Sequence, residues 1–179
     1  MKTNHLNRML LTLTLLATLP SVNAETIGRF QVKQGIATDS ATGLIWMRCL
    51  LGMEWDGENC VGNAISYNWE QALQKPKGFS YAGYNDWRLP TLDELETLID
   101  DNVGNPHTNT PFIKRLVFPR SICNDNTSCY SWSSSPYEYA FARHGYITHQ
   151  ARVVDFYHGY IPHDRKSRYY AVRLVRGGQ

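Results

Sequence analysis

The fold is decided by one stretch near the middle of the chain, which reads Asp86-Trp87-Arg88-Leu89-Pro90-Thr91-Leu92-Asp93-Glu94-Leu95-Glu96-Thr97-Leu98-Ile99-Asp100. Within it, Thr91 and Glu94 have the spacing of a capping box, in which each side chain accepts the backbone N–H of the other residue. Apolar residues then recur at helical spacing, at Leu92, Leu95, Leu98 and Ile99. The pattern predicts a well-capped core helix of about three turns.

The residues before this helix predict an extended segment. Pro90 cannot donate an interior helical N–H and keeps Leu89 out of the helical region, so the helix begins after it. Side chains alternate along an extended chain, which places Trp87 and Leu89 on one side and Arg88 on the other. We therefore expect the stretch to be mainly structural, with a buried lead-in and a buried helix.

The first 24 residues have the organisation of a secretory signal peptide. Lys2 and Arg8 precede an apolar run over residues 9–19, and Val22-Asn23-Ala24 fits the small-residue cleavage rule. The run is too short to span a bilayer comfortably, and no Cys follows it that would indicate a lipid anchor. The prediction is a leader over residues 1–24, one domain over residues 25–179, and no stable membrane insertion.

Charge is unevenly distributed along the mature chain. Residues 25–101 carry 6 basic and 12 acidic side chains, whereas residues 102–179 carry 10 and 4, so the mature net charge is zero. Five of the six His also lie in the second half. A basic, His- and Tyr-rich half favours an acidic partner, although the two halves can equally neutralise each other within one fold. A neutral exported protein is not expected to bind nucleic acid.

Four Cys in an exported chain predict two disulfides and an oxidising location: the periplasm, the cell surface or the medium. Among the three possible connectivities we favour the local one, Cys49 with Cys60 and Cys123 with Cys129. A structural zinc site of four Cys would normally show C-x-x-C pairs, and the sequence contains none.

The remaining patterns predict short strands and a second helix. Residues 30–33 read as a strand, and residues 35–39 and 44–48 flank a turn that ends at Gly43. Asn68 and Gln71 form a weaker capping pair before a short amphipathic helix that ends before residue 76. A second hairpin turn lies at His158-Gly159, and residues 169–176 read as a strand. Together these elements predict a single α+β domain with antiparallel strands and long ordered loops.

Several motifs follow one another over nearly the whole mature chain: Asp39-x-x-Thr42-Gly43-Leu44-x-Trp46, Asn68-Trp69-Glu70-x-Ala72-Leu73, Gly83-Tyr84-x-Asp86-Trp87-Arg88-Leu89-Pro90-Thr91-x-x-Glu94-Leu95, Tyr130-x-Trp132-Ser133-Ser134 and Val172-Arg173-x-Val175-Arg176. This pattern resembles the bacterial family of exported domains that includes the C-terminal domain of the Legionella collagen-like adhesin. The central and terminal motifs also look like those of the formylglycine-generating-enzyme group.

The resemblance implies a C-type-lectin-like fold with paired terminal strands, two helices and a long loop region that presents a binding surface. Most of the family has no assigned biochemistry. The domain of the adhesin is associated with binding of sulfated glycosaminoglycans and with trimers. The resemblance therefore implies a carbohydrate-binding or adhesion role, and this chain carries no collagen-like repeat before the domain.

Enzymatic and metal-binding alternatives have weaker support in the sequence. A formylglycine-generating oxidase needs redox-active Cys in the C-terminal part of its fold, and no Cys follows Cys129. Ser133, Asp155 and either His144 or His149 are a possible triad, but a chain of this length offers many such combinations. The His residues of the pairs His144/His149 and His158/His163 are five positions apart, so on a strand the two side chains would point to opposite faces. Each pair would need a turn between its two His to bind zinc. We expect no metal and no cofactor.

A dense run of Tyr, Arg and His between residues 137 and 170 is the best candidate for a binding surface. Aromatic faces suit sugar rings, and Arg side chains suit sulfate, phosphate or carboxylate groups. Because charged groups rarely bury unpaired, we expect the exposed ligand-binding set to be Arg143, His144, His149, His158, His163, Arg165, Lys166 and Arg168. The hypothesis is an exported, non-catalytic module that binds an acidic glycan or a protein. The alternatives are an enzyme on the same scaffold and an envelope-assembly module.

Overall fold

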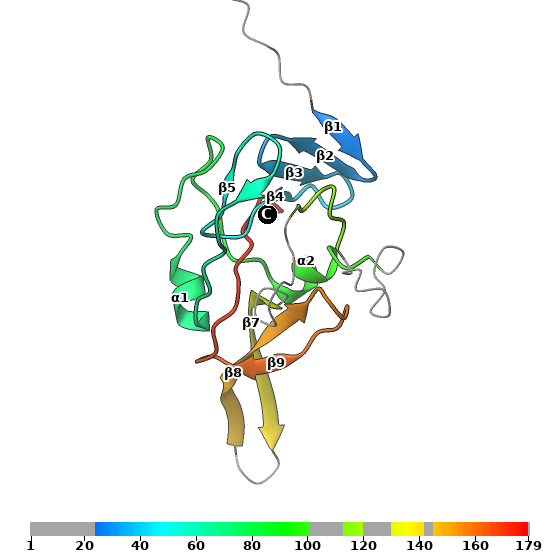
Figure 1. The fold of residues 1–179 in the computed structure, drawn as a ribbon. Helices are drawn as coiled ribbons and strands as arrows, with labels where there is room; N and C mark the ends of the chain where they lie inside the picture. Colours follow the sequence, from blue (N-terminus) through cyan, green and yellow to red (C-terminus); the bar gives the residue numbers. More distant parts are fainter. Residues whose placement is uncertain (1–23, 101–112, 120–129, 142–144, 179) are drawn as a thin grey trace, which may run out of the picture.

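The computed structural model describes residues 24–100, 113–119, 130–141 and 145–178 (Figure 1). Within these ranges it contains two short helices and three antiparallel sheets, which confirms the α+β class. Residues 1–23 of the predicted leader and the Cys123/Cys129 pair lie outside the described residues. The Cys49–Cys60 disulfide is present, with the two Cα atoms 5.5 Å apart, and closes a loop between the first sheet and the first helix.

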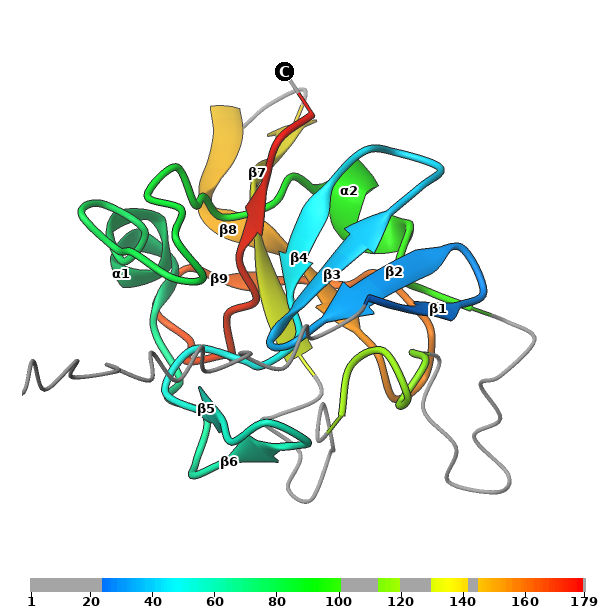
Figure 2. The same cartoon turned by 90° about the horizontal axis from the view of Figure 1, so that it is seen from above.

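A five-stranded antiparallel sheet contains both the first and the last strand of the domain, at its two opposite edges (Figure 2). Its strands are β1 (Glu25–Ile27), β2 (Phe30–Lys33), β3 (Ile36–Asp39), β4 (Ile45–Met47) and β10 (Val175–Arg176), in that order across the sheet. The prediction that the terminal strands pair with each other is wrong, because β10 pairs with β4 and β1 lies at the opposite edge. The β2 and β3 predictions and the turn at Gly43 are confirmed.

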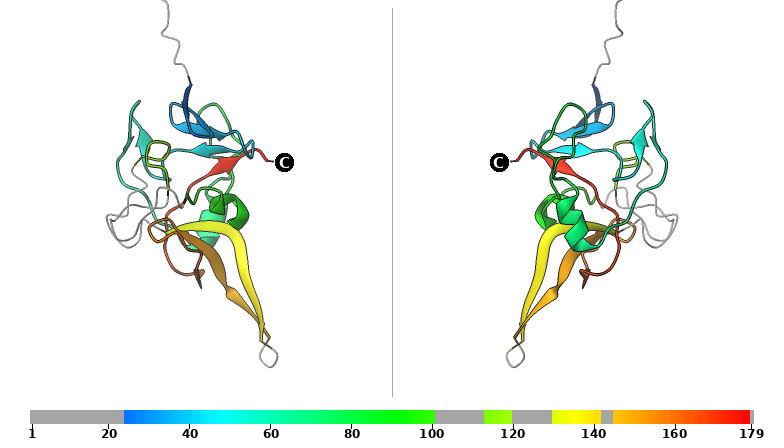
Figure 3. Two further views of the ribbon diagram at one scale, coloured as in Figure 1. Left: turned by 90° about the vertical axis from the view of Figure 1, so that its right-hand side faces the viewer. Right: turned by 90° about the vertical axis from the view of Figure 1, so that its left-hand side faces the viewer.

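The second sheet is built from β7 (Tyr130–Phe141), β8 (Gly145–Asp155) and β9 (His163–Arg165). The outer parts of β7 and β8 project from the body of the domain as a two-stranded ribbon (Figure 3). A bulge between Trp132 and Pro136 shifts the β7–β8 register by two residues. Two further strands, β5 (Glu54–Trp55) and β6 (Cys60–Val61), form a small ribbon inside the disulfide-closed loop.

Both predicted capping boxes are present at the starts of helices α1 (Trp69–Gln74) and α2 (Leu92–Glu96). The α2 helix is shorter than predicted, with five residues rather than three turns. After Glu96 the backbone hydrogen bonds join residues three apart instead of four. Leu98 N–H donates to the Leu95 carbonyl, and Ile99 N–H donates to the Glu96 carbonyl. The apolar stripe still faces the core, with Leu95 and Leu98 buried and Leu92 and Ile99 partly buried, because a tighter turn also returns residues at this spacing to one side.

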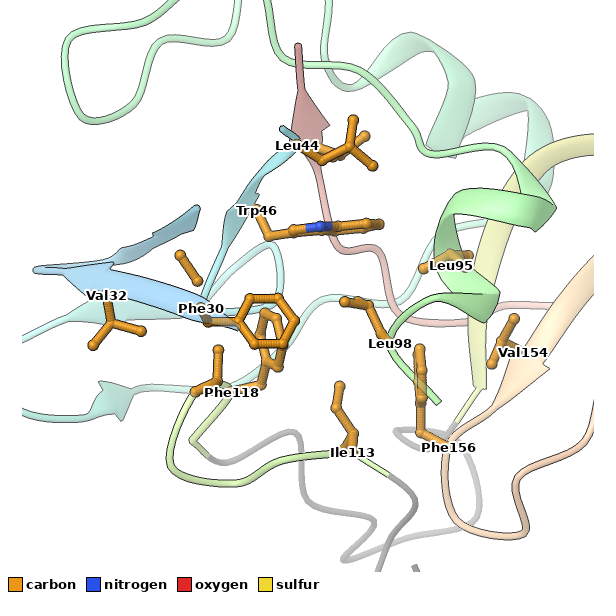
Figure 4. Packing of buried hydrophobic residues seen from close by; sticks show 13 residues of the cluster. Phe30, Val32, Leu44, Trp46, Leu95, Leu98, Ile113, Phe118, Val154 and Phe156 are labelled. Atoms are coloured by element: carbon orange, nitrogen blue, oxygen red, sulfur yellow. The ribbon is translucent and has the colours of Figure 1, made fainter. Parts of the chain in front are cut away.

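The core consists of two clusters of buried side chains. The first lies between the five-stranded sheet, α2, β8 and the segment 113–118 (Figure 4), and includes Phe30, Trp46, Leu95, Phe118 and Val154. The second lies between α1, the lead-in to α2 and the β7–β8 pair, and includes Trp69, Trp87, Leu89, Trp132 and Val153. Trp46 and Trp132 are both fully buried, so one large aromatic side chain lies in each cluster.

The central motif clamps α2 to the end of the chain. Arg88 donates two hydrogen bonds to the Glu94 carboxylate, at 2.7 and 2.6 Å, and a third to the Gly177 carbonyl at 2.9 Å. Glu94 also accepts the Thr91 backbone N–H at 2.8 Å, so one carboxylate serves both the cap and the ion pair. Paired, charge-assisted hydrogen bonds of this kind are strong and directional. The motif therefore holds the scaffold together.

Two buried Arg side chains satisfy backbone carbonyls. Arg173 donates to the carbonyls of Met47 and Arg48 at 2.7 and 2.6 Å, and its guanidinium lies 4.7 Å from the Phe118 ring centre. Burial lowers the pKa of Arg173 to about 9. Arg48 donates to the carbonyls of Gln34, Leu116 and Val117 and so ties the segment 113–119 to the first sheet. Buried carbonyls need such donors, which explains Arg in these apolar surroundings.

Two turn positions give a matched stability prediction. Gly43 has φ +71° with no atom within 4 Å of a built Cβ, and Ala82 has φ +51° in the turn between Tyr81 and Tyr84. We expect Gly43→Ala to lower the free energy of unfolding by about 1 kcal/mol, and Ala82→Gly to raise it by about 0.5–1 kcal/mol, because only Gly adopts positive φ freely. Urea unfolding measures both, and two changes of the same sign would contradict the account.

Candidate ligand-binding site

The candidate site is one face of the three-stranded sheet. Arg152 on β8 pairs with His163 on β9, and Gln150 pairs with Arg165 one step along the same strands. Directly paired residues share a face, and so do residues two apart along a strand. These four side chains therefore lie on the same face, whereas Ala151, between them in sequence, is buried against the second core cluster.

An aromatic and cationic stack lies on this face. The Tyr137 ring on β7 stacks on the His163 ring, with centres 3.8 Å apart and planes 4° from parallel. The Arg152 guanidinium lies 4.5 Å from the Tyr137 ring centre. His163 is exposed, and Tyr137 and Arg152 are half-buried. The stack joins all three strands through side chains that have both an apolar plane and a polar edge.

The turn after β9 adds two further cations, Lys166 and Arg168. Arg168 N–H donates to the Arg165 carbonyl at 2.9 Å, and both side chains are exposed. The Lys166 ammonium lies 4.2 Å from the centre of the Trp69 ring. The backbone N–H of Trp69 donates to the Lys166 carbonyl at 3.0 Å. The start of α1 thus fixes the turn. We call Tyr137, Arg152, His163, Arg165, Lys166 and Arg168 the cationic strip.

Asp164 lies on β9 between His163 and Arg165 and is engaged by Tyr170 and Arg168. It accepts the Tyr170 hydroxyl at 2.5 Å, and Arg168 approaches it only to 3.9 Å. Burial, together with the hydrogen bond to Asp164, raises the pKa of Tyr170. Among the residues that the structure describes, Arg152, Arg165 and Lys166 form no ion pair. These three side chains therefore contribute positive charge that no carboxylate of the described residues pairs with.

The structure brings together four of the eight predicted binding residues: His163, Arg165, Lys166 and Arg168. His149 is exposed, but it lies three residues before Arg152 on β8. Because side chains alternate along a strand, it lies on the face opposite Arg152. His158 lies at the turn after β8, where its Nδ1 is 2.6 Å from the buried Asp155 carboxylate. Arg143 and His144 lie outside the described residues.

Two members of the strip were not among the predicted exposed set. Tyr137 and Arg152 both occur in the Tyr/Arg/His run, but the sequence does not show which strand face each occupies. The face follows only from the β7–β8 register, which the bulge after Trp132 changes. An Arg flanked by the apolar residues Ala151 and Val153 is the one available sequence signal, since alternation places it opposite them.

The possible catalytic triad does not assemble among the described residues. Ser133 is fully buried, and its hydroxyl donates to the Arg152 carbonyl at 3.0 Å. The Asp155 side chain accepts the Tyr157 backbone N–H at 2.9 Å and is paired with His158. No three His, Cys, Asp or Glu side chains of the described ranges lie close enough to hold a metal ion.

Together, the fold and the strip define a small disulfide-bonded α+β domain with a cationic, aromatic sheet face. The sequence model of the family described as the Lcl C-terminal domain matches residues 35–176, and the chain belongs to this family. No curated protein matches the chain as a relative. Neither helix of the described part of the chain is long and apolar enough to cross a membrane.

Proposed function

We propose that the protein is an exported, non-catalytic binding module that takes an acidic glycan on the cationic strip. The observation that carries the proposal is the stacked set of Tyr137, His163 and Arg152 beside the exposed turn of Arg165 and Arg168. The disulfide is consistent with export to an oxidising compartment. We further propose that the scaffold, with two helices and long loops between antiparallel strands, is C-type-lectin-like.

The chemistry of the strip suits a sulfated or carboxylated sugar. Arg side chains bind planar or tetrahedral oxyanions through several parallel hydrogen bonds. Aromatic planes provide rigid, amphipathic contact area for the apolar face of a sugar ring. Arg152 and Arg165 lie on neighbouring positions of one face, about 7 Å apart along the strand direction. A linear polyanion can therefore meet several cations at once.

The test is a heparin titration of the mature protein, residues 25–179, at low and moderate salt. The variant Arg165→Ala/Lys166→Ala/Arg168→Ala should bind about 10–100-fold more weakly, because each lost surface charge removes about 0.5–1 kcal/mol. Its affinity should also depend less steeply on salt. The matched control removes three exposed cations elsewhere, as Lys33→Ala/Lys77→Ala/Arg115→Ala.

A further variant separates glycan binding from general attraction of polyanions. Tyr137→Ala leaves the net charge unchanged and removes the ring on which His163 stacks. We expect it to lower heparin affinity about three- to tenfold with an unchanged salt dependence, because the lost contact is not ionic. Equal losses for the strip variant and the matched control would refute the proposed site.

A further inference from the structure

Apart from the cationic strip, the domain has a hollow of about 560 Å³. It lies among the β2–β3 turn, the disulfide-closed loop and the turn at residues 79–82. Three aromatic residues, Trp55, Phe79 and Tyr81, line it together with the thioethers of Met47 and Met53. No residue of the cationic strip lines this hollow. Its volume and its aromatic lining are those of a small-molecule site.

The walls of the hollow are fixed by contacts behind them. Trp55 pairs with Cys60 of the disulfide across the β5–β6 ribbon, and the Arg48 guanidinium lies 4.2 Å from the Trp55 ring centre. The Trp87 indole N–H donates to the Tyr81 carbonyl at 3.1 Å. A Cβ at Gly35 would lie 1.7 Å from the Tyr81 hydroxyl oxygen, so this contact requires glycine. The site is therefore largely formed before any ligand arrives.

Unfavourable backbone geometry is concentrated at the same place. Gln34 (φ +52°) and Ala82 (φ +51°) are the two non-glycine residues with positive φ in the described part of the chain. Both line the hollow. Such conformations cost free energy and cluster at functional sites, where the surrounding structure holds them in place.

Charge indicates the kind of ligand. Glu54 is the only charged residue among the described residues that line the hollow, and it is exposed with no ion pair to any described residue. Asp56 and Glu58 are exposed on the same loop. An anion is disfavoured here, and a cation with an apolar surface is favoured. Burial raises the pKa of Tyr81, and the charge of Arg48, whose guanidinium also lies over the Trp55 ring, lowers this pKa to a smaller extent. Because Arg48 thus acts on both of these rings, the Phe79 ring is the better contact for that cation.

We propose that this hollow, which we call the aromatic pocket, binds an alkylated ammonium group, such as that of choline. Aromatic rings attract such cations through the negative faces of their π systems, and a carboxylate at the rim adds attraction without desolvating a buried charge. The occupant of the aromatic pocket is opposite in charge to the ligand proposed for the cationic strip. The two sites share no lining residue, so each can be tested without changing the other.

The test is calorimetric titration of the mature protein with choline and tetramethylammonium, and with 3,3-dimethylbutan-1-ol as the neutral molecule of the same shape. We expect both cations to bind and the neutral molecule to bind at least about fivefold more weakly. Glu54→Gln should weaken binding of the cations about three- to tenfold. Glu58→Gln, on the same loop but outside the aromatic pocket, is the control and should leave it unchanged.

The ring contact is tested by Phe79→Leu, which keeps an apolar side chain of similar size and should lower cation affinity about fivefold. Thermal unfolding checks that each variant is folded. Co-sedimentation with phosphatidylcholine but not phosphatidylglycerol vesicles would place the ammonium group on a lipid, and binding of free choline alone would place it on a soluble molecule. Equal binding of choline and its neutral analogue, or no binding of either, would overturn the proposal.

Discussion

Arg173→Ala should lower the free energy of unfolding by about 3–5 kcal/mol, the range for removing one partner from a buried charged network. Arg173 is 1% exposed, and its guanidinium supplies donors to the Met47 and Arg48 carbonyls. The truncation leaves these carbonyls without that donor and opens a void beside Phe118. Chemical denaturation of the domain over residues 25–179 measures the change.

Arg165→Ala is the matched control, because this Arg is exposed and forms no ion pair with any described residue. It should change the free energy of unfolding by less than about 0.5 kcal/mol. Arg173→Lys should recover only part of the stability, since one ammonium cannot reproduce the planar geometry of the guanidinium. A loss below about 1 kcal/mol in Arg173→Ala would show that the buried network does not stabilise the fold.

Glu94→Ala should destabilise the domain by about 2–4 kcal/mol, because it removes the capping box and leaves Arg88 half-buried without its carboxylate. The side chains of Arg88 and Glu94 are 27% and 18% exposed, so solvent screens their pairing only partly. Arg88→Met/Glu94→Ala should be less destabilising than the sum of the single changes, since each single change also leaves its partner unpaired. Additive losses in that double-mutant cycle would contradict the clamp.

The same pair gives a pH dependence with a definite sign. Burial raises the pKa of Glu94, but the hydrogen bonds from Arg88 and Thr91 outweigh it, and the net pKa is lowered. A carboxylate whose pKa is lower in the folded state stabilises at neutral pH, and this contribution is lost as the pH falls through that pKa. The stability difference between the native protein and Glu94→Gln should therefore shrink below about pH 4. A difference that stays constant down to pH 2 would contradict this assignment.

Local signals in the sequence predicted local structure well. Capping boxes, the turn at Gly43 and the alternation of Trp87, Arg88 and Leu89 depend on near neighbours, and each is confirmed. Three features that depend on distant contacts were predicted wrongly. The α2 helix ends early, and residues 169–174, predicted as strand, contribute only isolated bridges at Tyr170 and Ala171. The pairing of β10 with β4 rather than with β1 is likewise determined by contacts between segments that are distant in the sequence.

The candidate site was predictable in composition but not in geometry. The run of Tyr, Arg and His indicated the sheet that carries the candidate site, since four of its predicted residues lie on β9 and the turn that follows. Which side chains share one face of the sheet depends on the bulge in β7 and on the pairing of Arg152 with His163. The spacing of residues within a single strand reveals neither. The aromatic pocket was not predicted, because Gly35, Trp55 and Tyr81 come from three separate segments.

The clamp between Arg88 and the final residues has a consequence for how the chain matures. Arg173 bonds to Met47 across 126 positions, and Arg88 to Gly177 across 89. Contacts this remote form only when both partners are available, so the domain closes after synthesis of its last few residues. Until then the five-stranded sheet lacks β10, and the Met47 and Arg48 carbonyls lack the donor that Arg173 supplies.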